Sequence, residues 1–192
     1  MNYSIPGANQ GAGLIGRITD GWRLSGVTVL QSGYPFAVYT SQVFIPSTAS
    51  NGSYIRDSNG LIVPAANSGD YNADGNNMDY PNVPDYSQQT SRSAYLKGLW
   101  PTSHFTAPTP GTEGNELQDQ FRNPGFANTD LGLAKSTKIA ESVNFEVRFD
   151  FFNAFNRPNL QSVTSDLSSS NFGKVTSQYN PRWIQIGANL SF

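Results

Sequence analysis

The sequence predicts an all-β fold of antiparallel strands that cross a membrane as part of a β-barrel. Three observations favour this fold: apolar and polar residues alternate along several segments, short turns alternate with long connections, and aromatic residues gather near the predicted strand ends. Charged residues make up 14% of the chain, well below the roughly 25% that is usual in soluble domains. Such a composition is typical of extended strands joined by polar loops.

The clearest alternation runs from Val143 to Phe151, where every odd position is apolar and every even position is polar. Only a strand with two different faces has this period of two. The polar face carries Glu146, Arg148 and Asp150, which suit a water-filled lumen better than a packed core. A shift of one residue would place Arg148 in lipid at a cost of about 2–4 kcal/mol at the midplane. The register is therefore strongly specified.

Four strands are predicted in all, over about residues 21–39, 126–138, 143–156 and 182–192. Their clean alternation over nine or more residues matches the roughly 9–11 residues of a membrane-spanning strand. In the first strand, Trp22, Leu24, Thr28 and Leu30 share one face. Pro35 interrupts this strand, because proline is confined to a bulge or an edge.

The start of the chain is expected to be the tail of a preceding strand, over Met1 to Pro6, followed by a glycine-rich turn. The glycines of this turn are Gly7, Gly11, Gly13 and Gly16. Met1 to Pro6 lacks the basic start and apolar stretch of a signal peptide. We therefore expect the natural N-terminus of an exported protein to lie upstream.

The connections alternate in length. Residues 139–142 form a tight turn, whereas residues 40–125 and 157–181 form long loops. Compact soluble domains rarely contain such long irregular connections, but outer-membrane barrels combine short periplasmic turns with long external loops. Barrels need at least about eight strands, and open edges are not tolerated in hydrocarbon. The predicted strands are thus expected to be a fragment of a larger barrel.

A soluble secreted β-sandwich is the alternative, because an alternating strand can also pack its apolar face against a second sheet. In that case the chain would be a binding module, for example one that binds carbohydrate with the help of calcium. Aromatic residues in the long loop offer surfaces for stacking on a sugar.

Five segments are similar to the end of Oar-like TonB-dependent receptors, and they occur in the order found in that family. They are Gly21 to Phe36, Arg122 to Leu131, Phe149 to Asn159, Phe172 to Ser177, and Pro181 to Phe192. The resemblance implies the C-terminal portion of a barrel of about 22 strands with an N-terminal plug. It also implies transport energised through TonB, which the barrel would contact only through the plug.

The resemblance further implies a place in the outer membrane of a Gram-negative-type bacterium. The protein would form the wall of a transporter or receptor that imports or senses an unidentified ligand. Its partners would be outer-membrane lipid, the rest of the barrel, the plug and the outer-membrane assembly machinery. The last strand is similar to the signal that this machinery reads, with the residues Trp183, Ile184, Ile186, Leu190 and Phe192. The alternative is an ordinary edge strand that ends at an aromatic residue.

A possible calcium site lies in the long loop. Its oxygen ligands would be Asp70, Asn72, Asp74, Asn76 and Asp79. The first four lie at alternate positions, as in calcium loops whose ligands converge on one ion. Gly75 permits the sharp turn, but Pro81 stands where an EF-hand needs a glutamate. The alternative is an unliganded turn held by Asx hydrogen bonds.

The remaining function classes find little support. The single histidine, His104, has no acid beside it that could orient it as a base, and no catalytic motif is present. The sequence therefore predicts no enzyme. A net charge of −2 without a basic cluster predicts no nucleic-acid partner. The Glu146, Arg148 and Asp150 ladder is expected to pair with charges on neighbouring strands.

Overall fold

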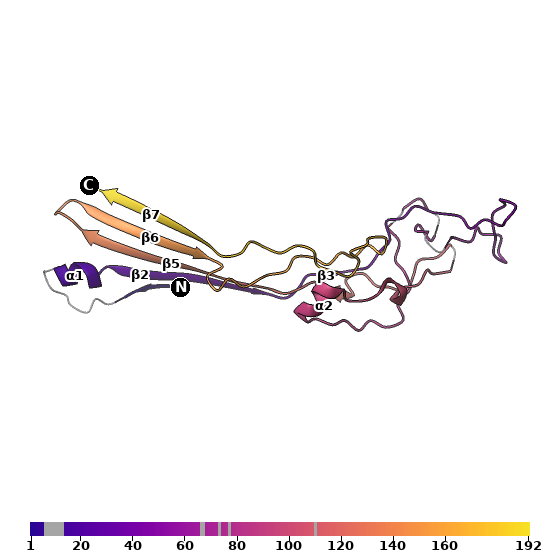
Figure 1. Ribbon diagram of the computed structural model, residues 1–192, viewed down its shortest axis with the longest axis horizontal. Helices are drawn as coiled ribbons and strands as arrows, with labels where there is room; N and C mark the ends of the chain where they lie inside the picture. Colours follow the sequence, from indigo (N-terminus) through magenta and orange to yellow (C-terminus); the bar gives the residue numbers. More distant parts are fainter. Residues whose placement is uncertain (6–13, 66–67, 73, 77, 110) are drawn as a thin grey trace. The chain divides into compact units, whose positions relative to one another are not determined.

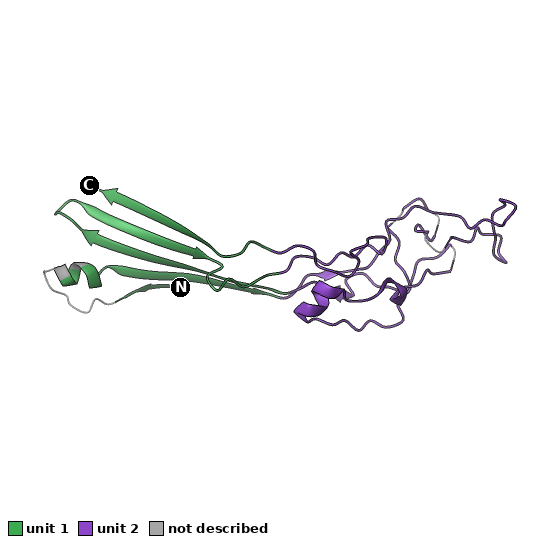
Figure 2. Ribbon diagram, in the orientation of Figure 1, with its two compact units in different colours: residues 1–31, 125–159, 179–192 green, residues 32–124, 160–178 purple. Residues whose placement is uncertain are grey.

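The computed structural model describes residues 1–5, 14–65, 68–72, 74–76, 78–109 and 111–192. The chain divides into two compact units (Figure 2). Unit 1 comprises residues 1–31, 125–159 and 179–192, and unit 2 comprises residues 32–124 and 160–178. No helix in the described residues is long and apolar enough to cross a membrane.

Unit 1 is a five-stranded sheet in the order β1-β2-β5-β6-β7, with every neighbouring pair antiparallel (Figure 1). The strands are β1 (Asn2–Ser4), β2 (Trp22–Gln31), β5 (Phe126–Lys138), β6 (Asn144–Phe152) and β7 (Trp183–Ser191). The short α1 (Leu14–Thr19) precedes β2. Both long connections of the chain leave the sheet from the same end, whereas the turn between β5 and β6 lies at the other end.

The observed strands differ from the predicted ranges mainly at their ends. The range 126–138 has the predicted bounds, and β7 is one residue shorter at each end than 182–192. The range 21–39 was too long, because β2 stops at Gln31. Pro35 lies instead in β3 (Pro35–Phe36), which pairs with β4 (Phe121–Arg122) in unit 2. Proline lacks the N–H that a central strand needs, so β2 could not have continued through this position.

The predicted end of the third strand at residue 156 was also wrong, because the chain turns at Asn153. Asn153 and Asn156 both have a φ of 50°, a left-handed conformation that asparagine tolerates better than most residues. The Asn153 side chain accepts a hydrogen bond from the Arg157 N–H at 2.9 Å and donates one to the Arg157 carbonyl at 2.9 Å. This closed turn ends β6 at Phe152.

At the start of the chain, β1 confirms the predicted strand before the first long strand. Three glycines of the predicted turn, Gly7, Gly11 and Gly13, lie outside the described residues. The fourth, Gly16, is part of α1 and not of a turn, so the prediction was wrong for this residue.

Unit 2 contains the two segments that the sequence predicted as irregular loops, and they pack together around apolar cores. The first core is Val38, Val83, Phe105, Phe121 and Phe172, with Trp100 packed against it. The Trp100 and Phe121 rings lie 4.5 Å apart, and those of Phe105 and Phe172 lie 5.4 Å apart in an edge-to-face arrangement. Aromatic pairs of this kind add about 0.5–1.5 kcal/mol beyond the area they bury. The long connections are thus folded structures in their own right.

The second core of unit 2 forms around the helix α2 (Arg92–Lys97). Ser91 caps the helix by accepting a hydrogen bond from the Ala94 N–H, and Gly98 ends it at a φ of 115°. Tyr95 points into a cluster of Leu160, Val163 and Val175. Its hydroxyl donates to the Arg122 carbonyl at 2.9 Å. This helix thereby joins the two halves of unit 2, which are distant in sequence.

Unit 2 contains a buried carboxyl group, that of Glu116. One of its oxygens accepts a hydrogen bond from the Val38 N–H, while the other has no partner. Burial raises the pKa of Glu116 to about 7, although the Val38 hydrogen bond opposes this change. Because burial raises the pKa of Glu116, the unfolded chain loses this proton at a lower pH than the folded chain. The free energy of unfolding of unit 2 therefore falls as the pH rises from the pKa of the unfolded chain towards 7.

Candidate functional site

One face of the sheet in unit 1 is apolar because the register aligns the odd positions of β5 and β6 with the even positions of β2 and β7. Three cross-strand rows show this: Leu24, Leu133, Phe149 and Ile186; Gly26, Leu131, Phe151 and Ile184; Thr137, Phe145 and Leu190. Leu30 is 78% exposed on this face and Ile186 is 67% exposed. Soluble monomers rarely leave so continuous an apolar face open.

The burial pattern in unit 1 is the inverse of that in a soluble domain. Among its described residues, the only buried apolar residue is Ala134, which lies on the polar face of β5. The other buried apolar side chains of the described chain all belong to unit 2. Unit 1 therefore has no apolar core of its own, and its apolar side chains face outward from a single layer of strands.

Lys135 is the exception on the apolar face, where it lies in a row with Trp22 and Val147. Its ammonium group donates a hydrogen bond to the carbonyl of Asp20, two residues before β2 begins. The same group lies 5.7 Å from the centroid of the Trp22 ring. The apolar stem can thus stay on the face while the charge reaches its edge, as lysines do at membrane interfaces.

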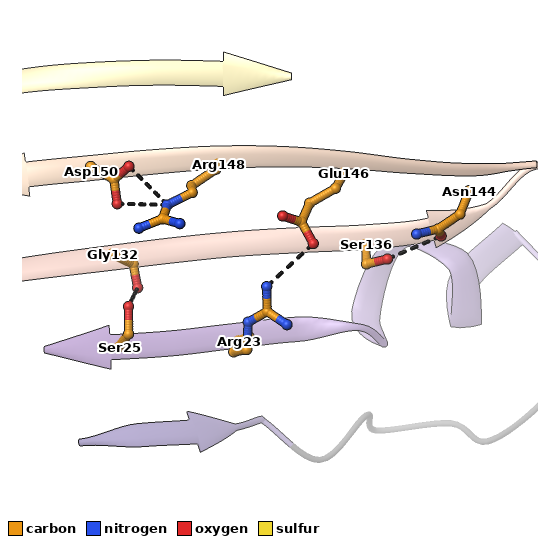
Figure 3. Close-up of polar contacts among 8 residues, drawn as sticks. All are labelled: Arg23, Ser25, Gly132, Ser136, Asn144, Glu146, Arg148 and Asp150. Atoms are coloured by element: carbon orange, nitrogen blue, oxygen red, sulfur yellow. Dashed lines mark hydrogen bonds and ion pairs between the residues drawn. The ribbon is translucent and has the colours of Figure 1, made fainter. Parts of the chain in front are cut away.

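The opposite face carries a network of charged and polar side chains (Figure 3). Arg23 of β2 pairs with Glu146 of β6 at 3.3 Å, and Arg148 pairs with Asp150 of the same strand at 2.8 Å. The ladder of β6 was expected to pair with charges on neighbouring strands, and this expectation was wrong. Arg23 instead reaches Glu146 across β5, and Arg148 pairs with Asp150 within β6. Exposed pairs contribute only about 0–1 kcal/mol each. The network therefore adds little stability, but it indicates that this face is in contact with water.

Small residues on β5 make the cross-sheet pairing possible. Ala134 lies between Arg23 and Arg148 in the register, and Ser136 lies beside Glu146. At Gly132, an added Cβ would lie 2.6 Å from the Ser25 hydroxyl and 2.9 Å from an Asp150 oxygen. The Ser25 hydroxyl itself donates to the Gly132 carbonyl at 3.3 Å. A side chain at position 132 would therefore displace the side chains of Ser25 and Asp150.

Aromatic side chains flank the polar face where the long connections leave. Phe152 and Trp183 are cross-strand partners whose rings stack with centroids 4.1 Å apart. Nearby, Phe126 and Tyr179 meet edge to face at 5.1 Å. Asp130 accepts a hydrogen bond from the Asn153 N–H at 2.9 Å and so fastens this end of β5 to the turn after β6.

The five residues of the predicted assembly signal do not share one face. Trp183 lies on the polar face, with Phe152. Ile184, Ile186 and Leu190 lie on the apolar face and are 52–67% exposed. Phe192, which follows β7, is 95% exposed. Alternation by itself places Trp183 opposite the isoleucines, so this feature was readable from the sequence.

Unit 2 brings three of the five predicted calcium ligands together. One oxygen from each of Asp70, Asp74 and Asp79 lies within 4.8 Å of the others. The other two side chains complete local turns: the Asn72 oxygen accepts from the Asp74 N–H at 3.0 Å, and the Asn76 oxygen accepts from the Met78 N–H at 3.3 Å. The Asx turns that formed the alternative interpretation are therefore present beside the carboxylate cluster.

A fourth acid, Glu113, adjoins this cluster and was not singled out from the sequence. It accepts hydrogen bonds from the Asn72 amide at 3.0 Å and from the Tyr80 N–H at 3.0 Å. Burial raises the pKa of Glu113, and the carboxylates of Asp79 and Asp74 raise it further, although the Tyr80 hydrogen bond lowers it. Glu113 follows Asp79 by more than thirty residues, so local spacing could not have revealed it.

A single antiparallel sheet with one apolar and one polar, ion-paired face defines the wall of a membrane β-barrel. A family model described as "Outer membrane beta barrel domain" matches residues 1–185, and the chain belongs to this family. No curated protein and no solved structure matches it. Membership places the protein in the outer membrane, with its apolar face in a lipid environment. The alternative of a soluble β-sandwich was therefore wrong.

Gly132 of β5 and Gly187 of the edge strand β7 both lie on the polar face and give a matched test of its packing. We expect Gly132→Leu to destabilise the sheet by about 1–3 kcal/mol, the usual range for overpacking. Gly187→Leu should cost much less, because a Cβ there would meet nothing within 4 Å. The measurement is the urea concentration at which the purified protein loses its fast-migrating folded form in unheated gels. Equal sensitivity of both variants would contradict this account of the polar face.

Proposed function

We propose that the chain is part of the wall of a larger, plugged barrel that imports or senses a ligand at the outer membrane. Such a barrel would be of the TonB-dependent receptor type, as the resemblance of five segments implies. The observation that carries the proposal is the sheet itself, which has two open edges and two faces of opposite polarity.

The open edges are β1 and β7, which lie at opposite ends of the strand order. In hydrocarbon, each unpaired backbone N–H or C=O costs several kcal/mol. Five strands are also fewer than the roughly eight of the smallest known barrels. Further strands must therefore pair with both edges, and we propose that the rest of the same barrel supplies them.

The charged polar face supports a wet lumen, and we propose that a plug fills part of it. Its side chains pair with one another through Arg23 and Glu146 and through Arg148 and Asp150. The Arg148 side chain still remains 57% exposed. A plug with polar side chains could bind such a surface. Contact with TonB would then be made by the plug and not by this sheet.

The direction of the strands supports an external position for unit 2. Long connections lie on the external side of outer-membrane barrels, and short turns lie on the periplasmic side. We therefore propose that the turn after β5 faces the periplasm and that residues 32–124 and 160–178 face outward. A folded external unit is a suitable place for first contact with a ligand.

The last strand is proposed to be the element that the outer-membrane assembly machinery reads. Support comes from the exposed apolar row of Ile184, Ile186 and Leu190 on an edge strand, followed by the exposed Phe192. A strand of this kind presents both a free backbone edge and a regular apolar face to a binding partner.

The plug can be tested with a photo-crosslinking amino acid at two adjacent positions of β7. At Gln185, on the polar face, we expect crosslinks to a globular segment of the same polypeptide. At Ile186, on the apolar face, the matched control should crosslink to lipid and to no peptide. Mass spectrometry of the protein isolated from outer membranes identifies the products. Crosslinks from Gln185 to a second copy of the chain, or to nothing but water, would sink the plugged-barrel proposal.

The assembly role can be tested at the terminal residue. Deletion of Phe192 should lower the amount of folded protein in the outer membrane several-fold, because the aromatic end of the exposed strand is lost. Phe192→Tyr, which keeps the ring, should retain normal assembly. The readout is the ratio of folded to unfolded protein in membranes after a short pulse of synthesis. Normal assembly of the deletion variant would show that Phe192 is not part of the signal.

A further inference from the structure

Unit 2 concentrates negative charge at one point. Asp70, Asp74 and Asp79 direct carboxylate oxygens to within 4.8 Å of one another, and Glu113 hydrogen-bonds to Asn72 beside them. The ion pairs found among the described residues all lie on the sheet of unit 1, and none involves these acids. Like charges at this separation repel one another, so a cation bound here would relieve the repulsion.

Burial makes the cluster more than a group of surface acids. Asp79 is 1% exposed and Asp70 is 7% exposed. Each uses one carboxylate oxygen for a backbone hydrogen bond: Asp79 accepts from the Asn72 N–H at 3.1 Å, and Asp70 accepts from the Gly75 N–H at 3.2 Å. The other oxygen of each, Oδ1, is buried and has no hydrogen-bond partner. Buried charged oxygens are retained in proteins when something pairs with them.

The distances fit a calcium ion. Calcium binds oxygen ligands at about 2.3–2.6 Å, so two ligands on opposite sides of the ion lie about 4.6–5.2 Å apart. The three carboxylate oxygens lie within 4.8 Å of one another, so one ion can contact all of them. Asp74 lies on the exposed side of the cluster, where water can complete a flexible shell of six to eight ligands. Magnesium is less suitable, because it usually keeps several waters and binds through only one or two carboxylates.

We propose that Asp70, Asp74 and Asp79 form a calcium site that fastens the fold of unit 2. Asp79 is already the meeting point of three segments: its carbonyl accepts from the Thr40 N–H at 3.1 Å, and its carboxylate accepts from Asn72. The next residue, Tyr80, binds Glu113 through its N–H. A cation at this point neutralises the charge and holds Asp70, Asp74 and Asp79 together where they meet Thr40. It thereby orders the outer unit without taking part in the barrel wall.

Terbium luminescence provides the direct test, because terbium replaces calcium and Tyr71 lies next to a proposed ligand. We expect one saturable site in the whole protein, with calcium displacing terbium and magnesium in tenfold excess failing to do so. Asp79→Asn should weaken binding by more than about tenfold, since affinity follows the number of charged ligands. Asp57→Asn is the matched control: Asp57 holds a turn of the same unit by accepting from the Asn59 and Leu61 N–H groups.

Limited proteolysis separates loss of binding from loss of folding. Calcium should protect unit 2 of the natural protein against cleavage, relative to a chelator. Asp79→Asn removes a repulsive charge but keeps the shape of the side chain, so this variant should be equally resistant with and without calcium. If the natural protein binds no terbium, or if Asp79→Asn binds as tightly as Asp57→Asn, the calcium site is wrong. The plugged-barrel proposal is unaffected by either result.

Discussion

The fold of unit 1 depends on one constraint: the strands must pair so that the charged ladder of β6 stays off the face that meets lipid. Leu133, Phe149 and Ile186 form a continuous row only in the observed register. A slip of one residue would move Glu146, Arg148 and Asp150 into hydrocarbon together, at about 2–4 kcal/mol for the arginine alone at the midplane. This penalty, and not a buried core, fixes how the strands pair.

The same constraint explains the sequence of the polar face. Side chains of β2 and β6 meet across β5, and β5 accordingly carries the small residues Ala134 and Ser136 at the crossing. The Arg23 and Glu146 pair is too exposed to contribute much stability. Its value lies in covering a wet surface with matched charge. Unit 2 differs from unit 1 because it has an apolar core. It buries Phe121 and Val38 completely, as a soluble domain does.

Local patterns predicted the part of the structure that depends on a period of two. The bounds of β5, the polar ladder of β6 and the turn after β5 follow from alternation and turn chemistry alone. The core of unit 2 could not be predicted in this way, because Tyr95 meets Leu160 and Val175 across a long sequence separation. Glu113 joins the acidic cluster for the same reason. Asn153, by contrast, ends β6 through a left-handed turn, a local feature that strand alternation does not predict.

Spin labels placed one at a time along residues 143–152 test the central claim, that the odd positions of β6 face lipid and the even positions face water. In the outer membrane, collision rates with oxygen should peak at odd positions, and those with a polar nickel reagent should peak at even ones. Should the odd positions be shielded from both reagents, another protein layer covers them, and the sheet is not the wall of a barrel.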